Sequence, residues 1–183
     1  MTKPCEQCGN SVDLFKPGRV PRFCSTKCRV AANRPAIPVE LRNLDRWVRW
    51  SPTKVPLRLD GSAASSTDPG SWSSFAQVRA HRRKGFVLGE GIGCFDLDHC
   101  LTGSTLSRPA QAFLDNTPAT YVEVSPSGTG LHVWGLLPEG PGTRRKVGSL
   151  AIERYSRSRY ITVTGSRWPG SVPRLADLSE VTL

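Results

Sequence analysis

Three short segments in the second half of the chain carry residues suited to phosphoryl transfer. Asp96 and Asp98 flank a leucine, and Glu153 lies in a later apolar stretch. Between them, residues 125–132 (SPSGTGLH) form a glycine-rich sequence that ends in His132. Carboxylates bind divalent metal ions, and the backbone N–H groups of a glycine-rich turn bind phosphate oxygens. Together the segments predict metal-dependent chemistry on a phosphate-bearing substrate.

Asp96 and Asp98 are expected at the end of a buried strand. Residues i and i+2 of a strand point to one face, so the two carboxylates should lie side by side while Leu97 packs behind them. Such a pair is unfavourable unless a cation neutralises it, and Mg²⁺ or Mn²⁺ would do so. The alternative interpretation of an isolated Asp-x-Asp is a solvated loop or a helix cap.

Residues 125–132 are interpreted as a phosphate-binding turn that leads into a strand. The hydroxyls of Ser127 and Thr129, with the backbone around Gly128, are candidate phosphate contacts, and His132 follows at the exit of the turn. The sequence lacks the Gly-Lys-Ser/Thr of a P-loop and is not a dinucleotide-binding fingerprint. The alternative is an ordinary hairpin followed by a structural histidine.

Glu153 precedes an arginine-rich turn and a strand that begins with Arg159. A third acid could complete a metal site, and Arg159 could pair with a triphosphate. The alternative is a hairpin salt bridge between Glu153 and one of Arg154, Arg157 or Arg159.

Four of the six cysteines lie near the N-terminus. Two residues separate Cys5 from Cys8, and three separate Cys24 from Cys28. This spacing is typical of a four-coordinate Zn²⁺ site, and metal binding would supply the folding free energy that so short a segment lacks. Unligated cysteines are the alternative. Such modules bind nucleic acid, bind protein or brace a neighbour, and the basic residues of this one favour nucleic acid: Lys3, Lys16, Arg19, Arg22, Lys27 and Arg29.

The composition limits the class of protein. The chain of 183 residues has 25 Lys plus Arg against 15 Asp plus Glu, a formal net charge of +10, which favours a polyanionic partner. No apolar run approaches the ~20 residues needed to span a bilayer, so we expect no membrane association and a cytoplasmic location. In that compartment cysteines are thiols or metal ligands, and we expect Cys94 and Cys100 to be buried or surface thiols.

The chain divides into an N-terminal module at 1–33, an extended, proline-bearing linker at 34–40 and a larger domain at 41–183. The fold class expected for the larger domain is α+β, a mainly antiparallel sheet with flanking helices. We expect the strands at 85–88 and 92–95 to form a hairpin that delivers Asp96 and Asp98. The other expected elements are helices at 73–84 and 109–116 and strands at 46–50, 57–59, 121–124, 131–134, 150–153 and 160–163.

In their order, these segments resemble the archaeo-eukaryotic primase superfamily, in particular the primase-polymerase domains of bacteriophages and plasmids, over roughly residues 44–168. The acid-x-acid motif of that family matches Asp96 and Asp98, its Ser/Gly turn matches residues 127–132, and its third acid matches Glu153. Residues 67–72 (TDPGSW) and 159–165 (RYITVTG) also look like segments of that family.

The resemblance implies a primase-polymerase core with an RRM-like element. It implies that Asp96, Asp98 and Glu153 bind the catalytic Mg²⁺ or Mn²⁺ ions and that His132 contacts the phosphates of the incoming nucleotide. Further candidate phosphate contacts are Ser127, Gly128, Thr129, Arg159 and Lys54.

The leading hypothesis is therefore a primase-polymerase that makes or extends primers on single-stranded DNA from NTPs or dNTPs, in the cytoplasm of a bacterial host. The zinc module would grip the template, and a separately encoded replicative helicase is a candidate partner. One alternative is a non-catalytic replication protein that uses the same fold and zinc module to bind DNA. Another is a metal-dependent nuclease or a bacterial-type primase, in which a glutamate precedes Asp-x-Asp; here the glutamate follows it, which argues against that class.

Overall fold

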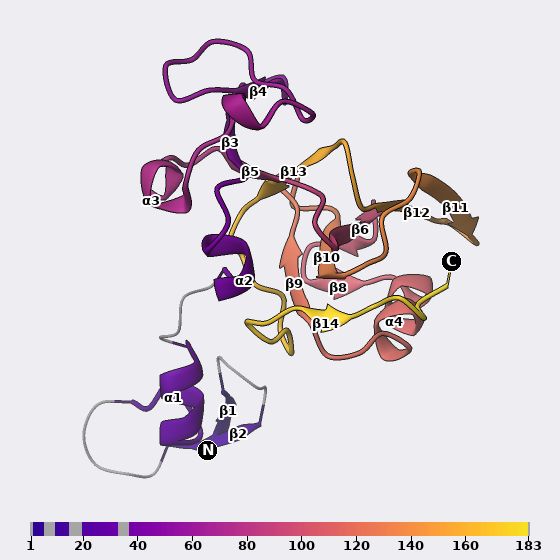
Figure 1. Cartoon of the computed structure of the whole chain (residues 1–183). Helices are drawn as coiled ribbons and strands as arrows, with labels where there is room; N and C mark the ends of the chain where they lie inside the picture. Colours follow the sequence, from indigo (N-terminus) through magenta and orange to yellow (C-terminus); the bar gives the residue numbers. More distant parts are fainter. Residues whose placement is uncertain (1, 6–9, 15–19, 33–36, 183) are drawn as a thin grey trace.

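A computed structural model describes residues 2–5, 10–14, 20–32 and 37–182. The N-terminal part has an antiparallel pair, β1 (Thr2–Pro4) and β2 (Ser11–Asp13), and one helix, α1 (Thr26–Ala32). Figure 1 shows these three elements grouped together. In the predicted linker, Val39 and Glu40 form the first turn of a short helix, α2 (Val39–Arg42), because Pro38 before it holds the backbone in a geometry compatible with a helix start. The division into module, linker and larger domain stays a prediction.

The larger part of the chain is built on a six-stranded sheet in the order β11-β12-β6-β10-β14, with β9 also paired to β10. Every pair in it is antiparallel except β10 with β14. Its strands are β6 (Ile92–Asp98), β9 (Tyr121–Val124), β10 (Leu131–Leu136), β11 (Thr143–Val147), β12 (Leu150–Tyr155) and β14 (Ala176–Asp177).

A second, four-stranded antiparallel sheet has the order β13-β5-β3-β4. Its strands are β3 (Trp47–Trp50), β4 (Pro56–Leu57), β5 (Lys84–Val87) and β13 (Tyr160–Val163). The remaining elements are the hairpin of β7 (Leu101–Thr102) and β8 (Thr105–Leu106), the 3₁₀ turn η1 (Pro69–Ser71), α3 (Phe75–Val78) and α4 (Arg108–Asp115). Mostly antiparallel sheets with few, short helices confirm the predicted fold class (Figure 1).

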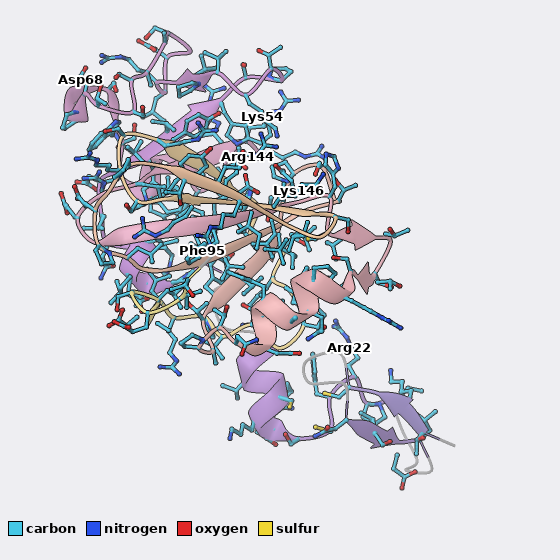
Figure 2. All side chains as sticks on the ribbon, turned by 90° about the vertical axis from the view of Figure 1, so that its right-hand side faces the viewer. Arg22, Lys54, Asp68, Phe95, Arg144 and Lys146 are labelled. Carbon is cyan, nitrogen blue, oxygen red and sulfur yellow. The ribbon has the colours of Figure 1, made fainter. Side chains whose placement is uncertain are left out.

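Alternation along β6 gives the six-stranded sheet two different faces. Phe95, labelled in Figure 2, and Leu97 are fully buried in a core with residues of α4. Phe95 meets Phe113 edge to face. Cys94, on the opposite face, joins a second core with residues of the four-stranded sheet, such as Phe86. Each large apolar side chain buried in this way contributes roughly 1.5–3 kcal/mol. The two cores hold β6 in place, and the face that carries Cys94 also carries the two aspartates.

Two local predictions were wrong. The helix predicted at 73–84 ends at Val78, and Lys84 instead opens β5, where it pairs with Arg49 and Val163. The capping box of Ser74 and Gln77 does start the helix, but sheet pairing overrides helix propensity further along. The predicted hairpin of 85–88 with 92–95 forms only a bridge between Gly89 and Ile92, and its two strands then enter different sheets.

Candidate active site

The candidate site is a row of polar side chains that crosses four neighbouring strands. Asp96 of β6 lies opposite Glu153 of β12 on one side and His132 of β10 on the other. Glu123 of β9 lies opposite His132 and ends the row. Asp98 lies two residues along β6 from Asp96 and therefore on the same face. The structure thus brings together the three predicted acids and the predicted histidine.

Asp96 is at the centre of this row and is crowded by negative charge. Burial raises its pKa, and the charges of Asp98 and Glu153 raise it further, while His132 and Lys54 act in the opposite direction. Both effects disfavour the ionised carboxylate. A divalent cation between these carboxylates would remove that penalty, so the donor set fits Mg²⁺ or Mn²⁺.

Glu153 has one partner on the neighbouring strand β11 and one on its own strand. Arg144 of β11 places Nε 3.3 Å from Glu153 Oε1, and the Tyr155 hydroxyl donates to Oε2 at 2.6 Å. The Arg159 guanidinium carbon lies 4.1 Å from the centre of the Tyr155 ring. Burial and the bond to Glu153 raise the pKa of Tyr155 to about 12, so the phenol keeps its proton. The alternative interpretation was a salt bridge from Arg154, Arg157 or Arg159. The ion pair is made instead by Arg144, because β11 pairs with β12 and places Arg144 opposite Glu153.

His132 is almost fully buried, with two carboxylates at its ring nitrogens. Nδ1 lies 3.3 Å from Glu123 Oε1, and Nε2 lies 3.8 Å from Asp96 Oδ1. Glu123 thus engages Nδ1, and Nε2 faces Asp96. The ring is therefore oriented with one nitrogen available to a group bound beside Asp96.

Glu123 is a residue that the sequence analysis missed. Its side chain has no exposed surface, and Oε2 accepts from the Tyr121 hydroxyl at 2.8 Å, from Thr164 N–H at 3.0 Å and Oγ1 at 3.1 Å, and from Gly165 N–H at 2.8 Å. Burial and Glu123 raise the pKa of Tyr121, which remains a donor. An acid within the apolar alternation of residues 121–124 was a usable signal, but its partners come from residues far away in the sequence.

The glycine-rich turn joins β9 to β10 and sets the position of His132. Gly128 has φ +77°, a left-handed conformation that glycine adopts readily. At Gly130 an added Cβ would lie 2.7 Å from the Leu97 carbonyl oxygen, so the absence of a side chain lets β10 approach β6. The hydroxyl of Ser127 lies 3.0 Å from the hydroxyls of Ser125 and of Thr129.

A cavity of about 380 Å³ opens beside Asp96 and His132. Lys54 and Arg159 line it as well, and both are exposed. Ser127 and Gly128 instead line a neighbouring cavity, so the turn does not share the Asp96 cavity. Figure 2 places Lys54 and Arg144 in the same upper part of the view. Two cations and the carboxylate of Asp96 therefore line one cavity, an arrangement that suits a metal-bound polyphosphate.

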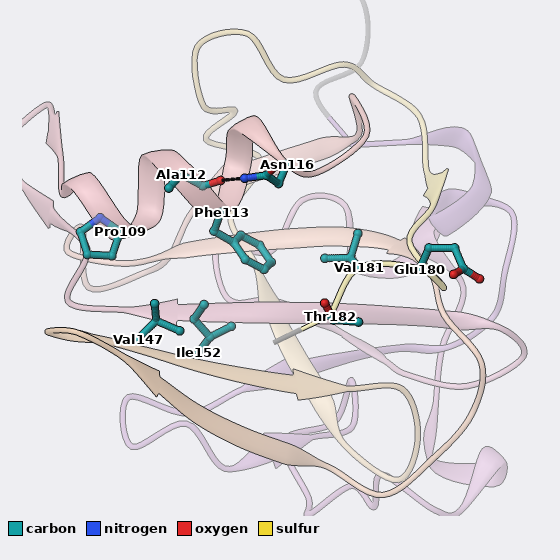
Figure 3. A pocket seen from close by; sticks show the side chains of 9 residues that line it. All are labelled: Pro109, Ala112, Phe113, Asn116, Val147, Ile152, Glu180, Val181 and Thr182. Carbon is teal, nitrogen blue, oxygen red and sulfur yellow. Dashed lines mark hydrogen bonds between the residues drawn. The ribbon is translucent and has the colours of Figure 1, made fainter.

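Another cavity lies on the opposite face of the six-stranded sheet. It has a volume of about 500 Å³ and is lined mainly by apolar side chains of α4, β12 and the last residues of the chain, including Phe113, Ile152 and Val181 (Figure 3). Ile152 and Glu153 are neighbours on β12, so their side chains point to opposite faces of the sheet. The sheet therefore separates this cavity from Glu153. Its lining has none of the acids of the site.

Three of the four predicted zinc ligands converge. The sulfur atoms of Cys5, Cys24 and Cys28 all lie within 4.8 Å of one another, and they could hold a metal ion. Cys8 lies outside the described residues. Three thiol ligands are a donor set typical of Zn²⁺. The other two cysteines of the described part, Cys94 and Cys100, are buried in the two hydrophobic cores.

The chain matches a known family over most of its length. Residues 28–178 match the family described as bifunctional DNA primase/polymerase, N-terminal, or Prim-Pol. The chain therefore belongs to the Prim-Pol family, whose members are nucleotidyltransferases, and the resemblance noted from the motifs is confirmed.

The chain is also similar to the DNA primase-polymerase of Nitratiruptor phage NrS-1. It is 36% identical over 152 residues, which cover 74% of this chain and 21% of the phage protein. The chain thus spans about a fifth of the length of this relative. In addition, no helix among the described residues is long and apolar enough to cross a membrane.

Proposed function

We propose that this chain carries the catalytic centre of a DNA primase-polymerase, which adds nucleotides to a primer strand on a single-stranded DNA template in phage or plasmid replication. The observation that carries the proposal is the alignment of Glu153, Asp96 and His132 on three adjacent strands. Membership of the Prim-Pol family supports it. A separately encoded helicase remains a candidate partner.

In the proposed reaction the 3′ oxygen of the primer attacks the α-phosphorus of an NTP or dNTP. A phosphorus–oxygen bond forms, the bond to the bridging oxygen breaks, pyrophosphate leaves with its electron pair, and the proton of the 3′ hydroxyl passes to solvent. Asp96, Asp98 and Glu153 would hold Mg²⁺ or Mn²⁺. When bound, such ions lower the pKa of the attacking hydroxyl and stabilise charge on the leaving group.

The other side chains have separate roles in this proposal. His132 would contact a phosphate oxygen through Nε2, since Glu123 already engages Nδ1. Lys54 and Arg159, which line the same cavity, would pair with the triphosphate. Ser127, Gly128 and Thr129 stay candidate phosphate contacts. Cys5, Cys8, Cys24 and Cys28 would bind Zn²⁺ and hold the N-terminal module in a shape that grips the template.

The test is primer synthesis and extension on a single-stranded template with labelled nucleotides and Mn²⁺. The double variant D96A/D98A should lose at least about a hundredfold in product, because charge stabilisation by metal contributes several kcal/mol. The control D115A/D177A removes two exposed carboxylates from α4 and β14 and should match the wild type. Equal product from wild type and D96A/D98A would contradict the proposal.

The second candidate function, DNA binding without catalysis, makes a different prediction. The wild type would bind single-stranded DNA with salt-dependent affinity yet incorporate no nucleotide with either metal. Clustered carboxylates at the proposed binding face count against it, since they repel a polyanion unless a cation lies between them.

A further inference from the structure

A basic groove with an aromatic wall lies beside the active site. Its volume is about 690 Å³, and it is bordered by the β3–β4 turn, by the segment before β5 and by the turn between β9 and β10. We call it the Trp50 groove, after the aromatic residue that lines it; its polar lining residues include Lys54, Arg82, Arg83, Ser125 and Ser127. None of the residues that line it, all in the described part of the chain, is acidic.

Trp50 is held as a fixed aromatic surface. The indole N–H donates to the Lys84 carbonyl at 3.0 Å, which fixes the ring against β5, and the side chain remains partly exposed. The Arg83 guanidinium carbon lies 5.6 Å from the ring centre. A rigid ring with an adjacent guanidinium can stack a nucleobase and pair with the phosphate next to it.

The groove leads directly to the acids. Lys54 lines both this groove and the cavity that contains Asp96, and β13 borders both, with Thr162 on one and Val163 on the other. Lys54 has φ +60°, a left-handed conformation that costs a non-glycine residue roughly 1 kcal/mol, and the Tyr160 hydroxyl donates to its carbonyl. The turn is thus tied in place between the two cavities.

We infer that the Trp50 groove binds single-stranded DNA and delivers the template to the active site. Bases stack on Trp50, while Arg82 and Arg83 neutralise the phosphates and the hydroxyls of Ser125 and Ser127 donate to them. This inference rests on the proposed function, because a template needs a path that ends beside the metal-binding acids. In this arrangement the glycine-rich turn binds a phosphate of the template strand.

The first test measures binding of a fluorescent oligo(dT) by anisotropy across a range of salt. The variant R82A/R83A should bind about tenfold or more weakly, and the slope of log affinity against log salt should shrink by about 1.4, since each phosphate contact on a single strand contributes about 0.7. The control R108A/R174A removes two exposed arginines from outside the groove and should keep the wild-type slope. Equal slopes in R82A/R83A and R108A/R174A would overturn the inference.

The second test concerns stacking. Replacement W50A should weaken oligo(dT) binding by about 5- to 150-fold, as expected for the loss of one base–aromatic stack. Replacement W50F keeps a ring and should restore most of the affinity, whereas a purely structural role of the indole hydrogen bond predicts that W50F and W50A behave alike. Circular dichroism melting of both variants shows which fraction is folded at the assay temperature.

A third measurement separates this inference from the proposed function. Binding of a labelled dNTP with Mn²⁺ should be unchanged in R82A/R83A, while the template concentration needed for half-maximal extension rises. If R82A/R83A loses dNTP affinity and keeps oligo(dT) affinity, the groove holds the nucleotide and the inference fails. If the wild type binds oligo(dT) through the groove but incorporates no nucleotide, the proposed function is wrong and the inference that the groove binds DNA stands.

Discussion

Asp96 and Glu153 lie directly opposite one another on β6 and β12, two antiparallel strands of one sheet. Fifty-six residues lie between them in the sequence, and the register of the two strands brings them together in space. Opposed residues of this kind have Cβ atoms about 5 Å apart, so two like charges there are unfavourable without a counter-ion. Repulsion between these carboxylates therefore disfavours the folded state until a cation binds.

Neutralising Asp96 should stabilise the metal-free protein. The pKa of Asp96 is raised by burial and by its acidic neighbours, so at neutral pH its charge disfavours the folded state. Replacement D96N removes the charge with little change of shape and should add about 1 kcal/mol to the free energy of unfolding, measured with urea in the presence of EDTA. Nucleotide addition should be lost in the same variant. A D96N protein less stable than the wild type would show that Asp96 is instead held by favourable contacts.

Mn²⁺ should raise the melting temperature of the wild type. A ligand at a hundred times its dissociation constant stabilises the folded state by about 2.7 kcal/mol, which for a domain of this size corresponds to a shift of several degrees. The shift should disappear in D96A/D98A and persist in D115A/D177A. Equal shifts in all three proteins would place the bound ion elsewhere.

Replacement E123Q should disturb His132 as well as stability. The amide nitrogen of glutamine cannot accept the hydrogen bonds that Glu123 Oε2 receives, so we expect a loss of about 1–3 kcal/mol in unfolding free energy. Nitrogen NMR of the His132 ring should then report a changed population of its two tautomers, because Nδ1 loses its carboxylate partner. Nucleotide addition, assayed at a temperature where the variant is folded, should fall about tenfold or more. An unchanged His132 spectrum would leave Glu123 with a purely structural role.

The cysteines should divide into two chemical groups. Burial raises the pKa of Cys100 to about 11 and that of Cys94 well above its usual value, so both stay protonated and unreactive in the folded protein. A chelator should expose Cys24 and Cys28 to alkylation while Cys94 and Cys100 react only after denaturation. Mass spectrometry of the labelled peptides distinguishes the groups. Labelling of Cys24 at the same rate with and without chelator would argue against a metal there.

Local pattern was enough to predict part of the site. Alternation placed Asp96 and Asp98 on one face of a strand with Leu97 buried behind them, and the structure agrees. Glycines before His132 correctly indicated a turn that leads into a strand. These features depend on neighbours only a few residues away, which a sequence displays directly.

Features that depend on distant pairing could not be predicted in this way. Glu123 takes its hydrogen bonds from Thr164 and Gly165, and Glu153 takes its ion pair from Arg144 rather than from the nearer arginines. The partition of β5 and β6 into separate sheets was likewise decided by pairing with β13 and β12. The energy of such contacts depends on which strands are neighbours in the assembled sheet, and local residue propensities do not reveal this.

The missing side chain of Gly130 has a final consequence. One methyl group at that position would collide with the carbonyl of Leu97 and push β10 outwards, and the imidazole two residues along would be carried away from Asp96. The absence of a side chain at Gly130 thus sets how close the imidazole lies to Asp96. Adding one methyl group there would change the geometry of the site without altering any reactive group.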